Sequence, residues 1–122
     1  MTSSPEILTF ALASDARGTL MPIEFASLPF TVRRLFVVTG PPGGATRGEH
    51  LVPCSQLLCL VAGDAFVSVG RDAKTLGNPI HLTQLGHGVL LHTGDYVRYS
   101  LTDATSSLLV RAEQPYQGIP AL

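Results

Sequence analysis

Apolar residues along the chain come in short runs, and breaks rich in glycine, proline and small polar residues separate these runs. Several runs alternate apolar with polar positions, which is the period of a half-buried β-strand, and no window keeps the period of an amphipathic helix. The breaks contain Gly, Pro, Asn and Asp, the residues that form tight turns. The pattern predicts strands at 7–13, 19–25, 30–38, 49–52, 56–63, 65–70, 79–84, 87–92, 95–101 and 106–112.

Turn signals at this spacing, with β-branched and aromatic runs between them, favour an all-β sandwich or barrel. About ten short strands in one domain suit a jelly-roll β-barrel of the cupin type. We expect one such domain over residues 1–122, with 1–6 and 113–122 as terminal extensions. We also expect Gly63 and Asp64 to turn a hairpin between 56–63 and 65–70. A small barrel can hold one ligand at its mouth, so function is expected there.

Composition narrows the classes of protein that fit. The chain has 122 residues, 45% of them apolar, which is enough for a hydrophobic core. Only 14% are charged and the net charge is −1, which argues against a surface for nucleic acid or anionic lipid. No apolar run reaches the ~20 residues of a membrane span, and the first residues do not resemble a signal peptide. We therefore expect a cytoplasmic protein, with Cys54 and Cys59 as reduced, packed thiols rather than zinc ligands.

Five segments follow one another in a recognisable order: RGTL (17–20), FTVRRLFVV (30–38), RGEH (47–50), QLLCLVAGDAFVSV (56–69) and GVLLHTGDYVRYSL (88–101). This order resembles the WxcM-like, sugar-nucleotide 3,4-ketoisomerase family of cupins, over roughly residues 17–112. The resemblance implies a metal-free, cofactor-independent homodimer that acts on thymidine-diphosphate 4-keto-6-deoxyglucose. The family signature reads R-G-x-H-A-H, followed by a glutamine and a β-hairpin, and its two histidines transfer protons.

The chain matches this signature in part. Arg47, Gly48 and His50 fit R-G-x-H, and Gln56 fits the downstream glutamine with one residue fewer between them. Val52 stands where the second histidine is expected. Phe36 and Val37 stand where the family has tyrosines after Arg34, and the acidic, tyrosine-rich C-terminal tail is absent. The resemblance thus implies His50 as the catalytic base, without its usual partner.

The proposed chemistry explains why a partner is needed. Moving a carbonyl from C4 to C3 of a sugar passes through an enediol, and histidine can both accept and release the proton at neutral pH. Two histidines at i and i+2 share one face of a strand, so Val52 removes that pairing. A partner could come from another strand, with His92 first, followed by Tyr96, Tyr99 and Glu49. Alternation places Glu49 opposite His50, in water.

Substrate binding is expected from basic and polar side chains. Arg47 is a candidate anion or oxyanion partner, and Arg34, on one face with Phe36, suits a diphosphate because its guanidinium is a planar fork. Tyr96, Arg98 and Ser100 share a polar face that is either solvent or cavity, while Val97, Tyr99 and Leu101 share a face that is expected in the core. The predicted catalytic residues are His50, Arg47 and His92, and the predicted substrate-binding residues are Arg34, Gln56, Tyr96, Arg98, Phe36 and Val52.

Residues 39–48, TGPPGGATRG, lack the G-K-[ST] of a phosphate loop and are expected to form a loop at the barrel mouth. A metal-dependent cupin needs about three histidines and a carboxylate beginning H-x-H, so no metal site is expected.

The sequence is compatible with three functions. The first is a sugar-nucleotide 3,4-ketoisomerase with His50 as the sole central base. The second is a cyclase or isomerase of a hydrophobic, polyketide-type natural product, in which an apolar barrel holds one reactive conformer. The third is a non-catalytic ligand-binding homologue. We expect an enzyme of the isomerase or cyclase type, whose substrate, direction and pathway the sequence does not identify.

Overall fold

The computed structural model describes residues 6–40 and 45–115, and the side chains of 45–48 are outside that description. The described chain is built from strands and one short 3₁₀-helix. The elements are β1 (Glu6–Thr9), β2 (Ala13–Asp15), β3 (Gly18–Leu20), η1 (Phe25–Ser27), β4 (Arg34–Thr39), β5 (Ala45–Leu51), β6 (Gln56–Ala62), β7 (Ala65–Gly70), β8 (Ile80–Leu82), β9 (His87–Leu91), β10 (Tyr96–Leu101) and β11 (Ser107–Ala112). No helix within these ranges has the length and apolar character needed to cross a bilayer.

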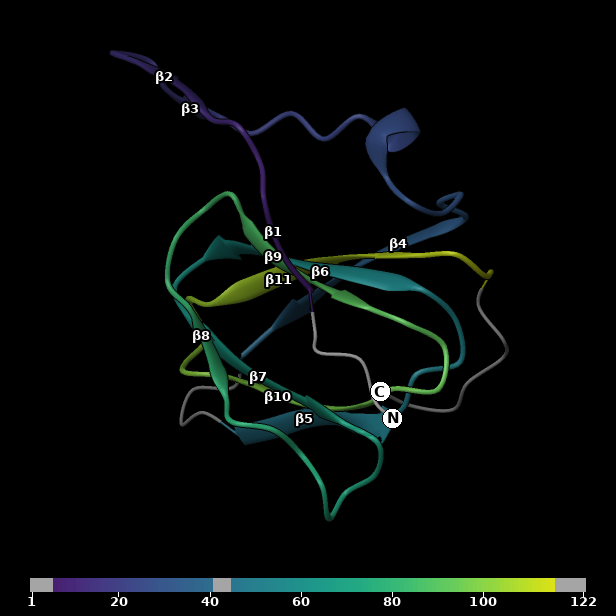
Figure 1. The fold of residues 1–122 in the computed structure, drawn as a ribbon. Helices are drawn as coiled ribbons and strands as arrows, with labels where there is room; N and C mark the ends of the chain where they lie inside the picture. The colour runs from purple at the N-terminus through teal and green to yellow at the C-terminus, as the bar shows by residue number, and fades with distance from the viewer. Residues whose placement is uncertain (1–5, 41–44, 116–122) are drawn as a thin grey trace.

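Two antiparallel sheets face each other (Figure 1). The larger has the order β1-β9-β6-β11-β4 and the smaller the order β5-β10-β7-β8. Short connections carry the chain from one sheet to the other, so β4 faces β5, β11 faces β10, β6 faces β7 and β9 faces β8. This is the arrangement of a jelly roll, and the predicted all-β, cupin-type fold is confirmed.

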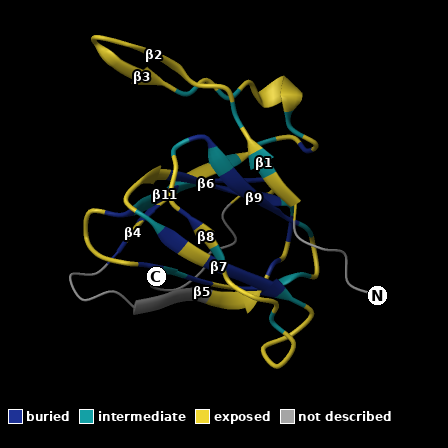
Figure 2. Cartoon of the chain, turned by 60° about the vertical axis from the view of Figure 1, so that its left-hand side comes forward, coloured by how far each residue is buried: buried dark blue, intermediate teal, exposed yellow. Residues whose placement is uncertain are grey.

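The core lies between the two sheets and consists of buried side chains from β4 and β6 to β11 together with Val52. Buried positions along these strands are dark blue in Figure 2. Alternation along β10 buries Val97, Tyr99 and Leu101, as predicted, and leaves Arg98 exposed. The other main members of this core are Val38, Val52, Leu58, Leu60, Ala65, Val67, Val69, Leu82, Val89, Leu91, Leu108 and Val110.

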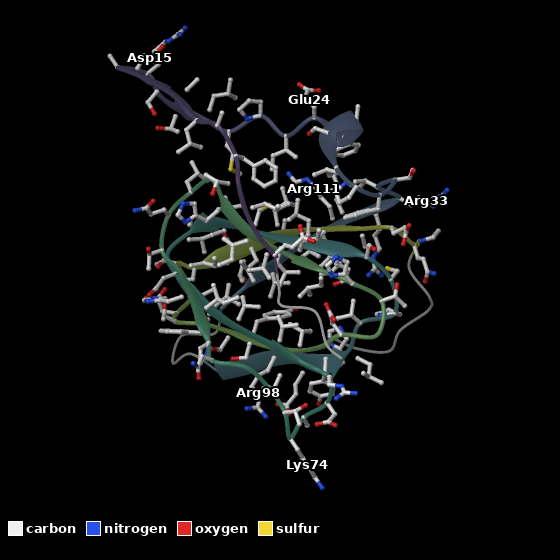
Figure 3. The ribbon with its side chains drawn as sticks, in the orientation of Figure 1. Asp15, Glu24, Arg33, Lys74, Arg98 and Arg111 are labelled. Atoms are coloured by element: carbon white, nitrogen blue, oxygen red, sulfur yellow. The ribbon has the colours of Figure 1, made fainter. Side chains whose placement is uncertain are left out.

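A second apolar layer covers the outer face of the large sheet. Phe30 packs there on Leu57, Cys59 and Leu90, with neighbouring residues of the 23–32 segment around it. The layer explains why QLLCL in β6 shows no alternation, since both faces of this strand are buried. Arg111 is buried in it, between the sheet and η1 (Figure 3), and its Nη1 donates to Cys59 Sγ at 3.5 Å. Cys59 and Cys54 are both free and buried, as predicted.

The predicted strand at 19–25 is wrong. β3 ends at Leu20, and the chain then runs without a ladder partner into η1. Before it, β2 and β3 form a hairpin that stands away from the barrel (Figure 1). The apolar residues that suggested a strand instead belong to the segment that crosses the outer layer, with Ile23 packed on Phe30 and its neighbours.

The predicted hairpin at Gly63-Asp64 is also wrong. The turn exists, with Gly63 at φ 68°, but β6 pairs with β9 and β11 while β7 pairs with β8 and β10. The turn therefore joins the two sheets. Local turn chemistry is the same for a hairpin and for such a corner, and only the non-local ladder partners distinguish them.

The prediction of a loop over 39–48 is wrong for residues 45–48, which form the first part of β5 (Ala45–Leu51). Residues 41–44 lie outside the described residues. Two further bounds differ at the ends. Glu6, predicted in the N-terminal extension, begins β1, and Glu113 of the C-terminal one is bonded to Ser55 through backbone and side chain. The remainder of those extensions, 1–5 and 116–122, is outside the description.

Candidate active site

The R-G-x-H segment lies in β5, whose pairing with β10 contains an irregularity. His50 is the register partner of Val97, and Arg47 is the register partner of Tyr99. Two residues of β5 therefore stand opposite the single residue Arg98, which is the geometry of a β-bulge. Because Arg47 and His50 are three apart, plain alternation would separate them. The bulge gives both a partner on the inner face of β10.

His50 stands at a corner of the barrel that is open in the sense that no ladder joins the two sheets there. β4 and β5 are the edge strands of their sheets on the same side, so the seam between them has no ladder. His50 is near the end of β5, and Arg34 begins β4 at the same end of the barrel. The His50 side chain is exposed although its register partner Val97 is fully buried. A ligand entering at this seam would therefore meet His50 from one sheet and Arg34 from the other.

The large sheet presents a row of inner-face positions at this end. The backbone register aligns Arg34 with Ala112, Ala112 with Gln56, and Gln56 with Leu91. Arg34 and Gln56 are thus about 10 Å apart at their backbones, with only the small Ala112 between them. The Arg34 guanidinium carbon lies 4.8 Å from the centre of the Phe36 ring, a cation–π contact that orients it. Arg34 and Gln56 therefore share one inner-face row, with Phe36 stacked against Arg34.

Val52 also faces inward, two residues after His50, as alternation predicts. It is 2% exposed and belongs to the core. Its backbone N–H donates to Asp95 O at 2.7 Å and its carbonyl accepts from Gly94 N at 2.9 Å, which ties the loop after β5 to the loop before β10. Val52 thus fills the core next to His50 with an apolar side chain that cannot donate or accept a proton in catalysis.

Three predicted site residues do not join His50. Tyr96 and Arg98 lie on the outer face of β10, because their neighbours Val97 and Tyr99 occupy the inner one. Arg98 points away from the barrel (Figure 3) and forms a bidentate ion pair with Glu49, at 3.1 and 3.0 Å. This bond lowers the pKa of the Glu49 carboxyl.

His92 is the third predicted site residue that lies away from His50. It is two residues after Leu90, so alternation places it on the same face, and Leu90 packs in the outer layer. Its Nε2 lies 3.6 Å from Glu6 Oε1 and its Nδ1 lies 3.7 Å from Asp95 Oδ2. His92 therefore lines a cavity of about 340 Å³ on the outside of the barrel, together with Glu6, Leu8, Ser27, Pro29, Ser55 and Leu90. A role in the barrel chemistry has no geometric support.

The side chain of Arg47 is outside the described residues, so only its backbone position is known. Within the described chain, no three His, Cys, Asp or Glu side chains are grouped so that they could hold a metal ion. The sequence offered Tyr99 as a possible partner of His50 but also as a core residue. The bulge in β5 places Tyr99 opposite Arg47, beside the R-G-x-H segment. Gly48 is the sequence signal for this bulge.

The fold and this corner define a small jelly-roll barrel with a histidine, an arginine and a glutamine at one open end. The chain belongs to the family described as FdtA: WxcM-like, C-terminal, whose model matches residues 3–119. No curated protein matches the chain in sequence.

Solved structures show the same fold. A 3,4-ketoisomerase from Helicobacter canadensis is 21% identical, with a TM-score of 0.84 over 96% of this chain and 88% of that one. A point mutant of the 3,4-ketoisomerase QdtA from Thermoanaerobacterium thermosaccharolyticum, in complex with TDP-4-keto-6-deoxyglucose, is 22% identical, with a TM-score of 0.82 over 97% and 86%. A dTDP-4-dehydrorhamnose 3,5-epimerase from Bacillus anthracis is 13% identical, with a TM-score of 0.77 over 93% and 74%.

Proposed function

We propose that this protein is an enzyme that binds a thymidine-diphosphate 4-keto-6-deoxyhexose at the open end of the barrel and isomerises it by moving the carbonyl from C4 to C3. The observation that carries the proposal is the position of His50, which the bulge in β5 turns to the inner register at the seam facing Arg34. Membership of the WxcM-like family supports it. So does the likeness in fold to isomerases that were solved with TDP or a TDP-keto sugar.

His50 would act as the base. It would take the proton from C3, which gives the enediol, and return a proton to C4 of the same ring face. Histidine suits both steps because its ordinary pKa, about 6.5, lies close to neutral pH. Neither step changes the oxidation state of the sugar as a whole, so the proposed reaction requires no redox cofactor.

Arg34 would bind the diphosphate. A guanidinium donates two parallel hydrogen bonds to phosphate oxygens, and the stacking on Phe36 reduces the freedom that this side chain loses on binding. Gln56, on the same inner row, offers both a donor and an acceptor to the sugar hydroxyls. Arg47 is a further candidate from its register position in β5.

Titration calorimetry with TDP tests the binding half of the proposal. Arg34→Ala is expected to weaken binding at least 10-fold, because a charge-assisted pair to phosphate is lost. Arg33→Ala is the matched control, since Arg33 is exposed and its Nη1 donates to the carbonyl of Glu113. No binding to wild-type protein at millimolar TDP would refute the proposal, as would equal effects of the two substitutions.

A second candidate function rests on the composition of the inner face. Apart from His50, Arg34, Gln56 and Tyr99, the described inner-face side chains are apolar or alanine. This lining would suit a cyclase or isomerase of a hydrophobic natural product, or a binding protein without catalysis. Failure of TDP to bind would favour this second group.

We also propose that the protein is a homodimer. Residues 11–20 are all exposed, and the hairpin that they include carries Leu12 and Leu20, which are 45% and 64% exposed. The edge strand β4 exposes Leu35 and Val37 on its outer face. An apolar edge strand and a projecting hairpin flanked by two exposed leucines can cover each other in a symmetric pair of chains.

Sedimentation equilibrium tests this second proposal. We expect twice the 12.9 kDa of one chain, and a shift toward the monomer in Val37→Asp. A wild-type monomer at micromolar concentration would contradict it.

A further inference from the structure

Among the described residues, the inner wall of the barrel also holds the phenol of Tyr99. We propose that Tyr99 is a second catalytic residue, which exchanges protons with the two sugar oxygens while His50 exchanges them with the two carbons. This inference rests on the proposed function. It assigns to Tyr99 the part that a second histidine would otherwise play, at a different place on the wall.

Tyr99 is positioned inside the barrel by both of its strand neighbours. It alternates with Val97 and Leu101, which are core residues, and its register partner in β7 is the buried Val67. The Tyr99 side chain is 7% exposed. Tyr99 therefore presents its ring to the core between the two sheets, and the hydroxyl of a buried tyrosine usually takes part in a hydrogen bond.

The β5–β10 register brings Tyr99 next to the R-G-x-H segment. Val97 is opposite His50, and Tyr99, two residues further along the same face, is opposite Arg47. His50 and Tyr99 are therefore diagonal neighbours on adjacent strands. The two strands, β5 and β10, lie side by side in Figure 1. Diagonal neighbours have backbones about 7–8 Å apart, a separation that long and aromatic side chains bridge. One sugar ring at the seam could thus touch both.

The other described inner-face groups do not supply this proton. Val52, at the place of the second histidine, is apolar. The side chains of Arg34 and Gln56 are a guanidinium and an amide, which are hydrogen-bond donors rather than general acids. His92, Tyr96 and Glu49 lie on outer faces. In the core cluster between the sheets, Tyr99 is the member that carries an acidic proton.

The proposed cycle moves two protons and returns both side chains to their starting states. His50 removes the proton from C3, and the electron pair of that bond forms the C3–C4 double bond as the C4 carbonyl opens. The Tyr99 hydroxyl gives its proton to O4, which produces the neutral enediol. The phenolate then takes the proton from O3, the C3 carbonyl forms, and C4 takes back the proton held by His50. Both side chains end as they began.

The test compares two tyrosines on the same strand. Tyr99→Phe removes the inner hydroxyl, and Tyr96→Phe removes one on the outer face. Conversion of TDP-4-keto-6-deoxyglucose is followed by proton NMR, together with TDP binding by calorimetry and the melting temperature of each variant. We expect Tyr99→Phe to lower kcat about 100-fold, with KM and TDP affinity within twofold of wild type. We expect Tyr96→Phe to change none of these.

A kcat for Tyr99→Phe within threefold of wild type would overturn the inference while leaving the proposed function intact. A loss of TDP binding or a melted protein in Tyr99→Phe would assign Tyr99 to packing, and would overturn it as well. A wild-type protein that binds TDP but converts no keto sugar would instead refute the proposed function, and the role of Tyr99 with it.

Discussion

The two ends of the barrel differ in how some of their polar side chains are hydrogen-bonded. At the end with the Gly63-Asp64 turn, Asp64 bonds His81 at 2.8 Å and accepts from the Thr102 hydroxyl, and Ser106 accepts from the Asp64 N–H at 3.1 Å. At the other end, His50 and Gln56 have no side-chain hydrogen bond to any described residue. Buried polar groups are normally satisfied within the fold, and Gln56 is only 5% exposed. The first end is closed by its own bonds, and the second leaves bonds for a ligand.

The contrast extends to the turns. Gly63 at the bonded end has φ 68°, and a Cβ there would lie 2.1 Å from Ser106 Oγ. Gly94 at the open end has φ 92°, and a Cβ there would meet nothing within 4 Å. The turn at Gly63 therefore has no room for a Cβ atom, whereas the loop at Gly94, beside Val52, has room for one.

The largest expected effect is on His50. Loss of a general base typically lowers the rate 10²- to 10⁴-fold, so we expect His50→Asn to lower kcat for the keto sugar about 1,000-fold, with TDP affinity little changed. His87→Asn, a histidine at the start of β9 near the opposite end, is the control. Proton NMR time courses of the conversion of TDP-4-keto-6-deoxyglucose measure the rates of both variants. Equal rates in the two variants would remove His50 from the chemistry.

The next largest effect is a difference in the free energy of unfolding between substitutions in the Gly63 turn and in the Gly94 turn. Gly63→Ala adds a steric clash to the strain of a positive φ, and we expect it to lower the free energy of unfolding by about 3 kcal/mol. Gly94→Ala carries the strain alone, and we expect about 1 kcal/mol. Urea denaturation followed by circular dichroism gives both values. If the two losses were the same, the tight packing assigned to the Gly63 corner would be wrong.

The smallest effect is a pH dependence at the bonded end. Hydrogen bonds from Thr102 and then His81 lower the pKa of Asp64. A carboxyl whose pKa is lower in the folded state adds stability above its unfolded pKa, about 3.9, and loses it as the pH falls through the folded value. The melting temperature of wild type should therefore fall more steeply than that of Asp64→Asn below about pH 4. Parallel melting curves across that range would contradict this account of the cluster.

Much of the fold could be predicted from the sequence because its turns are strongly marked. β6, β7, β9, β10 and β11 begin and end within one residue of the predicted bounds, since each is flanked by Gly, Asp, Ser or Thr turns. Alternation also placed the two faces of β10. These features depend on a few neighbouring residues, which is the range over which a sequence pattern carries information.

The errors have a common physical cause, which is dependence on distant parts of the chain. The turn at Gly63-Asp64 could not be assigned to a corner because the ladder partners of β6 and β7 lie elsewhere in the sequence. Residues 45–48 read as loop because Gly48 and the glycines before it break the apolar pattern, yet pairing with β10 makes them a strand. His92, with the parity of Leu90, faces the outer layer, which a continuous apolar run did not distinguish from the core.

The central claim is that the end holding His50, and not the bonded end, receives the nucleotide sugar. An amide NMR titration of the ¹⁵N-labelled protein with TDP tests it most directly, since it reports on every part of the barrel at once. We predict that the largest shifts fall on Arg34, His50 and Gln56, while Asp64, His81 and Ser106 stay unchanged. Shifts concentrated at the Asp64 cluster, or around His92 on the outer cavity, would contradict the account.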